Sequence, residues 1–212
     1  MRALGIDSGV EVRGITHRLH AAPSMPTEVE TLVAQEGRAI NICYNGLPYA
    51  NQPTHLELEI LPTSFWGYDT LPWAIRYART LNKPFFTMTG RFHEGWGDFG
   101  GLRPYHSLLY DCYNSIANAG TCSIGDHMHP RGTLDVPVYD LVERVFEHVE
   151  RLEPWTKGAR AVTEIAVLEP GMKGYPGLPF ERSSVIGAAR MLMELKCQFD
   201  VCSGEGDLSP YR

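Results

Sequence analysis

The sequence predicts an α/β fold: the C-terminal half of a (β/α)8 TIM barrel, followed by the first βα unit of a flavodoxin-like α/β domain. Short apolar runs alternate with amphipathic helical segments, which is typical of βα units in a parallel sheet. The long loops rich in glycine, aromatic and charged residues follow strands, as at the site-bearing face of a barrel. Only about four βα units are visible where a barrel needs eight strands, so we expect this chain to be an internal fragment of a larger protein.

Each element follows from the period of its apolar residues. Strands are expected at Ala39–Tyr44, His55–Leu61, Lys83–Arg91, Thr121–Ile124 and Val162–Leu168, with a further strand opening near Val201. Helices are expected at Pro26–Gln35, Leu71–Leu81, Tyr105–Ala119, Val138–Leu152 and Val185–Phe199. Pro72 suits a first helical turn and Gly120 suits a helix C-cap. These elements divide the chain into a weakly patterned segment 1–38, a partial barrel 39–156 and the start of a second α/β domain 157–212.

Composition argues against some partners. The 25 acidic residues outnumber the 19 basic ones, the formal net charge is -6, and no cluster of Lys and Arg occurs, so no nucleic-acid partner is expected. No apolar run approaches the roughly 20 residues of a membrane span, and no signal peptide is visible. The five cysteines form no C-x-x-C motif, and Cys43, Cys112 and Cys122 lie in apolar segments. Free thiols favour a reducing, cytoplasmic location.

Two carboxylates stand in the apolar strand of THLELEILP. Strand alternation places Glu57 and Glu59 on one face and Leu56, Leu58 and Ile60 on the other. Buried carboxylates are costly unless they are paired or functional. Either they pair with an arginine in the barrel core, or one acts as a general acid/base whose pKa burial raises.

Two further stretches offer sugar-binding side chains. MTGRFHEGWGDFGG places Arg91, His93, Trp96 and Asp98 in one loop after a strand. An aromatic face can stack on the apolar face of a sugar ring, whose hydroxyls take hydrogen bonds from the polar groups. The alternative is a loop ordered by internal ion pairs. Trp66 and Tyr68 in WGYD belong either to the core or to a sugar platform.

A third stretch, SIGDHMHPRG, carries Asp126, His127, His129 and Arg131 at a strand end. H-x-H can hold a metal ion because alternate strand residues share a face. The rest of a ligand set is not visible, so we expect these side chains to hydrogen-bond the substrate directly, with no metal.

Together, THLELEILPTSFWGYD, MTGRFHEGWGDFGG, SIGDHMHPRGTLD and EPW resemble bacterial glycoside hydrolases with a barrel of the hypothetical-glycosyl-hydrolase-6 type, related to the family 151 α-L-fucosidases. ERSSVIGAARMLMELKCQFDV is similar to the start of the β-galactosidase trimerisation domain that follows such barrels. The resemblance covers about residues 40–212 and leaves 1–38 unmatched.

The resemblance implies a retaining glycosidase, α-L-fucosidase-like or β-galactosidase-like, with a carbohydrate substrate, no cofactor and assembly into a homo-oligomer, a trimer or higher. Such enzymes use two carboxylates about 5–5.5 Å apart. Glu59, nearer the carboxyl end of its strand than Glu57, is the expected acid/base, and Glu57 is the second candidate. The nucleophile, an aspartate, is expected upstream of residue 1, so this chain alone is expected to lack half of the catalytic pair.

Two alternatives stay open. The first is a metal-dependent barrel hydrolase that uses His127 and His129. The second is a non-catalytic fragment that binds carbohydrate or nothing.

Overall fold

The computed structural model describes residues 40–41, 55–127, 129–169, 183–203 and 207–211. The helix expected at 26–35, most of the strand expected at 39–44 and the thiol of Cys43 lie outside the described residues. Within the described ranges, the alternation of strands and helices follows the expected order.

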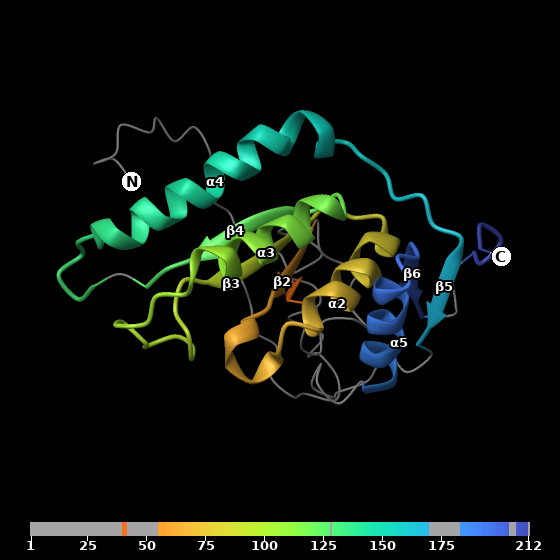
Figure 1. The fold of residues 1–212 in the computed structure, drawn as a ribbon, viewed down its shortest axis with the longest axis horizontal. Helices are drawn as coiled ribbons and strands as arrows, with labels where there is room; N and C mark the ends of the chain where they lie inside the picture. Colours follow the sequence, from red (N-terminus) through yellow and green to blue (C-terminus); the bar gives the residue numbers. More distant parts are fainter. Residues whose placement is uncertain (1–39, 42–54, 128, 170–182, 204–206, 212) are drawn as a thin grey trace, which may run out of the picture.

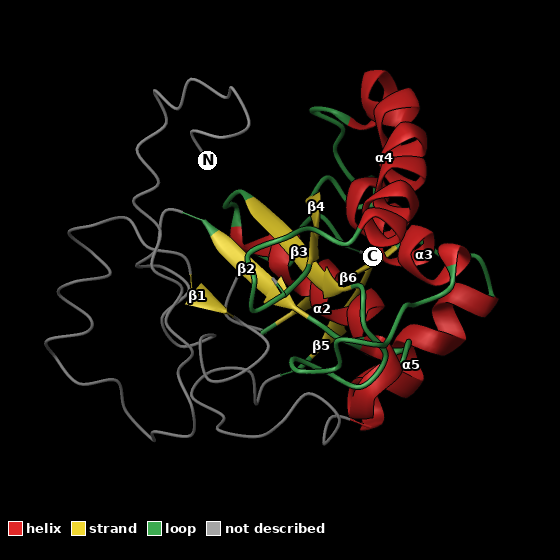
Figure 2. Cartoon of the chain, turned by 90° about the vertical axis from the view of Figure 1, so that its left-hand side faces the viewer, coloured by secondary structure: helices red, strands yellow, loops and turns green. Residues whose placement is uncertain are grey.

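A four-stranded parallel sheet forms the first part of the fold. Its strands stand in chain order and are β1 (Ile40–Asn41), β2 (Leu56–Glu59), β3 (Phe85–Gly90) and β4 (Thr121–Gly125). Helices α2 (Thr70–Ala78) and α3 (Tyr105–Ala117) connect the last three strands and lie on one side of the sheet (Figures 1 and 2). Consecutive βα units in parallel order are shown; closure into an eight-stranded barrel stays a prediction.

Strand alternation separates an apolar face from a polar one. Leu56, Leu58 and Ile60 are buried in one core cluster with Trp73 and Ile75 of α2. Glu57 and Glu59 therefore point to the opposite face, as predicted. Both carboxylates are buried, with 4% and 3% of their surfaces exposed.

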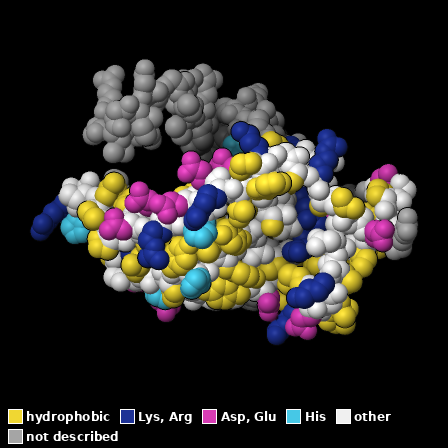
Figure 3. Space-filling view, turned by 45° about the horizontal axis from the view of Figure 1, so that its top comes forward, with side chains coloured by type: hydrophobic (Ala, Val, Ile, Leu, Met, Phe, Trp, Pro, Cys, Tyr) yellow, Lys and Arg dark blue, Asp and Glu magenta, His cyan; other side chains and the backbone are white. Residues whose placement is uncertain are grey.

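Helix α4 (Val136–Thr156) is longer than predicted at both ends. Pro137 is tolerated in its first turn because the amide hydrogen it lacks would have no helical partner there. Val145 and Val149 pack with Leu108 and Cys112 of α3. Only three of the 21 residues of α4 are buried. The face of the molecule on which α4 lies accordingly shows a broad area of hydrophobic side chains with charged ones around it (Figure 3).

A second, two-stranded parallel sheet follows, made of β5 (Ile165–Leu168) and β6 (Phe199–Cys202) and connected by α5 (Ser183–Glu194). The prediction of a helix from Val185 to Phe199 is wrong at its C-terminal end. Lys196 adopts a positive φ of 60°, which ends the helical path, and Phe199 pairs with Ile165 in the sheet. Its apolar side chain suits the core equally well from a strand.

The second sheet packs against α2 of the first (Figure 1). Val185, Ala189, Phe199 and Val201 belong to the same core cluster as Leu71. Two short turns, η3 (Pro62–Trp66) and η4 (Arg79–Leu81), flank α2. Among the described helices, none is long and apolar enough to cross a membrane.

Candidate functional site

Polar and aromatic side chains converge where β2, β3 and β4 end. Glu59 is the last residue of β2, and register places it on the same face as Met88 of β3 and Ser123 of β4. Glu57 lies on this face two residues earlier in the strand. The carboxyl ends of parallel strands with their loops are the usual location of sites in such sheets.

Trp96 reaches Glu59 from the loop that follows β3. The indole N–H donates a hydrogen bond to Oε1 of Glu59 over 2.9 Å. The Trp96 side chain is 41% exposed, so its contact with the carboxylate leaves part of the ring at the surface. The structure thus joins two residues that the sequence placed in separate motifs.

Arg91 ties the loops after β3 and β4 together. Its Nε donates to Oδ1 of Asp126 over 2.7 Å, and Nη1 donates to the carbonyl oxygens of Phe99 and Gly101 over 3.0 and 2.6 Å. The Arg91 side chain is almost fully buried. Its donors are therefore occupied largely by the protein, as the ion-pair alternative for this loop anticipated.

Asp98 orders the same loop from within. Its Oδ2 accepts the backbone N–H groups of His93 and Glu94 over 3.1 and 3.3 Å. These backbone hydrogen bonds, that from Glu94 first, hold the pKa of Asp98 below its ordinary value. The His93 side chain itself is exposed.

His127 is held between the two loops. Its Nδ1 accepts the backbone N–H of Gly97 over 3.2 Å. Its ring stacks on Phe92 at 4.9 Å and lies 4.2 Å from the ring of Phe99. An accepting Nδ1 assigns the proton of the neutral ring to Nε2, which is buried and has no hydrogen-bond partner among the described residues.

His129 is exposed, and its Nδ1 accepts the backbone N–H of Arg131 over 3.2 Å. His127 and His129 thus each use Nδ1 on a backbone group. In the part of the chain that the structure describes, no group of three or more His, Cys, Asp or Glu side chains could hold a metal ion.

A cavity of about 220 Å³ lies between the two loops. Its walls include Arg91, Phe99, Asp126, His127, His129 and Leu134. Nearby, burial raises the pKa of Tyr139, and the charge of Asp126 together with a hydrogen bond to it raises that pKa further. The cavity combines an ion pair, histidine and aromatic surface, which suits a small polar ligand.

A buried ionic network supports the loop from behind. Arg103 donates to Oδ2 of Asp111 over 2.8 Å, and the hydroxyl of Thr89 donates to the same oxygen over 2.8 Å. Burial raises the pKa of Asp111, and Arg103 offsets part of that rise. Arg103 also donates to the carbonyl of Gly90 over 3.2 Å, so the network holds the loop onto the end of β3.

Two predicted contact residues lie elsewhere. Trp66 is in the hydrophobic core with 5% of its surface exposed. The hydroxyl of Tyr68 is 2.6 Å from Oγ of Ser107, and its ring meets the edge of Tyr110. Neither residue joins the cluster around Glu59 and His127 among the contacts described. Both residues follow the end of β2 closely in the sequence. That position alone did not show whether the turn at 62–66 would place their side chains in the core or at the site.

Three residues of the site escaped the sequence analysis. Phe92 and Phe99 hold the ring of His127, and Gly125 lets Trp96 approach: a Cβ there would lie 3.0 Å from Cη2 of Trp96. Phe92 precedes the glycine-rich loop and Phe99 lies within it, and this proximity to Trp96 in the sequence was an available signal. The need for glycine at position 125 has no signal in a single sequence.

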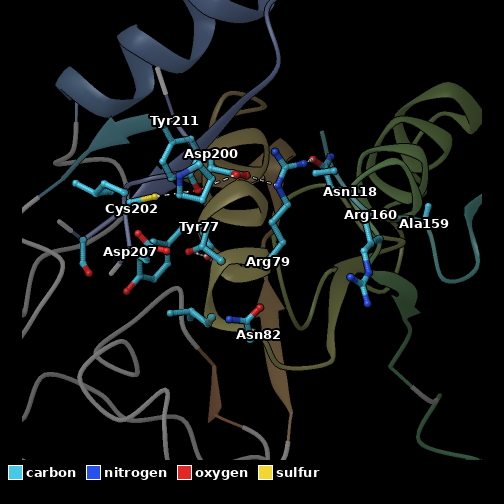
Figure 4. A pocket seen from close by; sticks show the side chains of 17 residues that line it. Tyr77, Arg79, Asn82, Asn118, Ala159, Arg160, Asp200, Cys202, Asp207 and Tyr211 are labelled. Atoms are coloured by element: carbon cyan, nitrogen blue, oxygen red, sulfur yellow. Dashed lines mark hydrogen bonds and ion pairs between the residues drawn. The ribbon is translucent and has the colours of Figure 1, made fainter. Parts of the chain in front are cut away.

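A larger cavity, about 820 Å³, opens at the opposite, amino end of the sheet. Figure 4 shows Arg79 reaching Asp200 and Asn118 at its wall. None of the predicted site residues lines it.

Comparisons with known proteins give a match among solved structures. No protein-family model matches the chain, and no curated protein sequence matches it. Among solved structures, it is similar to alpha-L-fucosidase isoenzyme 2 from Paenibacillus thiaminolyticus, with a TM-score of 0.78 and 34% sequence identity over 87% of this chain. The match covers 30% of that protein, so this chain spans about a third of its length.

Proposed function

We propose that this chain is part of a retaining glycoside hydrolase of the α-L-fucosidase type. The observation that carries the proposal is the similarity to a fucosidase at 34% identity over 87% of the chain. The geometry supports it, because a buried glutamate, an indole and a small polar cavity lie at the carboxyl end of a parallel sheet.

We assign the acid/base role to Glu59. In a retaining mechanism this carboxyl group protonates the glycosidic oxygen as the leaving group departs, and then deprotonates the attacking water. A second carboxylate, about 5–5.5 Å away, forms the glycosyl–enzyme bond. We expect that nucleophile, an aspartate, outside the described residues. Glu57 is the second candidate for acid/base because it shares the face of Glu59.

The substrate would lie over the exposed part of Trp96, with the cavity between the loops beside it. His93, His129 and Arg131 are exposed around this region and can donate to sugar hydroxyls. Asp98 and Arg91 act chiefly by shaping the loop that carries Trp96, since their polar atoms are bonded within it.

The decisive experiment makes Glu59→Gln in the whole hydrolase of which we propose this chain is part, so that the nucleophile is present, and compares it with the unchanged hydrolase on two fucosides. The glutamine keeps an oxygen for the Trp96 N–H and removes the transferable proton. We expect kcat/KM to fall about 10²- to 10⁴-fold on a fucoside with a poor leaving group, and far less on 4-nitrophenyl α-L-fucoside. Glu57→Gln tests the second candidate on the same face: a selective loss on the poor leaving group in this variant alone would move the role to Glu57. An equal loss on both substrates contradicts the assignment.

The 212-residue chain is also assayed alone on 4-nitrophenyl α-L-fucoside and 4-nitrophenyl β-galactoside. If it hydrolyses neither, calorimetry measures whether it binds L-fucose or D-galactose. Binding without hydrolysis would favour the non-catalytic carbohydrate-binding alternative. Faster hydrolysis of the galactoside would favour the β-galactosidase-like one. Absence of both hydrolysis and binding would overturn the proposal for this chain.

A further inference from the structure

The hydrogen bond between Trp96 and Glu59 has a defined direction. An indole N–H is a donor only, so Oε1 of Glu59 is the accepting atom over the 2.9 Å between them. A donor directed at one oxygen of a carboxyl group lowers the proton affinity of that oxygen. When the group is protonated, the proton is therefore favoured on Oε2.

Trp96 is itself held by both loops. Its ring centroid lies 4.8 Å from that of Phe92 and 6.0 Å from that of His127. Gly125, at the end of β4, provides room for the far edge of the indole, because a Cβ there would crowd both Trp96 and Met88 at 3.0 Å. These contacts come from β3, β4 and their loops, so the N–H is directed by the fold.

Hydrogen bonds of the loop hold the two residues that follow Trp96. The backbone N–H of Gly97, the next residue, donates to Nδ1 of His127, and Asp98 closes the loop on His93 and Glu94. Both residues that follow Trp96 are thus fixed by hydrogen bonds. An indole that served only as a sugar platform would not need its edge held in this way.

We propose that Trp96 is the positioning residue of Glu59: it holds Oε1 through its indole N–H and thereby presents Oε2 as the oxygen that transfers the proton. This inference rests on the proposed acid/base role of Glu59. It assigns to Trp96 a task different from the stacking predicted from the sequence, and the exposed part of the ring stays available to the substrate.

The first test is an NMR measurement on the full 212-residue chain and needs no activity. The four tryptophans give four indole N–H signals, and Trp96→Phe identifies that of Trp96 by its disappearance. In Glu59→Leu, which removes the acceptor, we expect this signal to move upfield and to exchange faster with water. The other three signals should stay in place. Trp155→Phe, at an 81% exposed position on α4, is the matched control for loss of an indole.

An unshifted Trp96 signal in Glu59→Leu overturns the proposal, because the hydrogen bond then does not exist in solution.

The kinetic arm separates this inference from the proposed function. In Trp96→Phe of the whole hydrolase, which keeps an aromatic ring but removes the indole N–H, we expect kcat to fall about 10- to 100-fold on the poor leaving group with little change in KM, because a misdirected acid loses rate more than binding. A change in KM alone would instead show a platform and overturn the positioning role. An indole signal that depends on Glu59 in a protein without hydrolysis or sugar binding would refute the proposed function while confirming the contact.

Discussion

The two ends of the first sheet use buried Arg–Asp pairs differently. At the amino end, Arg79 donates to Asp200 over 2.6 Å, to Asn118 over 2.7 Å and to the carbonyl of Phe199 over 2.6 Å. The other oxygen of Asp200 accepts from Thr163 and Tyr211. The nitrogens of Arg79 and both oxygens of Asp200 are thus bonded to other parts of the protein, which indicates a structural junction between the two sheets.

At the carboxyl end, the pair Arg91–Asp126 fixes two loops, but exposed aromatic and imidazole side chains stand around it. The cavity there is about 220 Å³, against about 820 Å³ at the amino end. The larger cavity therefore does not mark the better candidate site. What distinguishes the carboxyl end is the buried carboxyl group of Glu59, which accepts a hydrogen bond from a half-exposed indole.

The largest effect on stability is expected at the amino end. Arg79→Leu leaves Asp200 buried without its charge partner and should lower the free energy of unfolding by about 3–5 kcal/mol. Urea denaturation measures it. Arg190→Leu is the matched control: Arg190 is 63% exposed and pairs loosely with Asp69, so about 0.5 kcal/mol or less is expected. If both variants lose a similar free energy of unfolding, the Arg79–Asp200 pair contributes no more to stability than an exposed ion pair, and its role as a structural junction is contradicted.

A smaller, pH-dependent effect is expected at the carboxyl end. Because the folded pKa of Asp98 is lowered, its ionised form stabilises the loop above the ordinary aspartate range, and this stabilisation is lost as pH falls through the folded pKa. The protection factor of the Glu94 amide, which is its exchange rate relative to the intrinsic rate at the same pH, should therefore fall on acidification. In Asp98→Asn the protection factor should be lower at neutral pH and should change little with pH; protection equal to that of the unchanged protein would contradict the role of Asp98.

The smallest effect is expected in the reactivity of the cysteine thiols near the amino end of the sheet. A hydrogen bond from the Cys112 thiol lowers the pKa of Cys122, while the pKa of Cys112 is raised by the same contact and by burial. Cys122 also lines a cavity of about 380 Å³ beneath α4. Iodoacetamide should therefore modify Cys122 before Cys112, and before Cys202, whose pKa burial raises. Peptide mass spectrometry reads the order, and modification of Cys112 first would reverse the assignment.

Much of the fold could be predicted from local pattern. The helices and strands of the first sheet follow apolar periodicity, so their order and approximate bounds were accessible. The end of α5 was not, because Phe199 is apolar in either structure and only its pairing with Ile165 decides that it belongs to a strand. Closure of these βα units into a barrel stays a prediction, because it would require strands beyond those described.

The site divides in the same way. The sequence by itself determined that Glu57 and Glu59 share a face, since a strand has a period of two, and that the loops after parallel strands meet at one edge. Only the tertiary structure decided that Trp96 meets Glu59 across 37 positions while Trp66 is buried in the core. Local pattern specifies which side of an element a residue occupies. Which loop reaches which carboxylate depends on packing between elements, which no single segment of the sequence encodes.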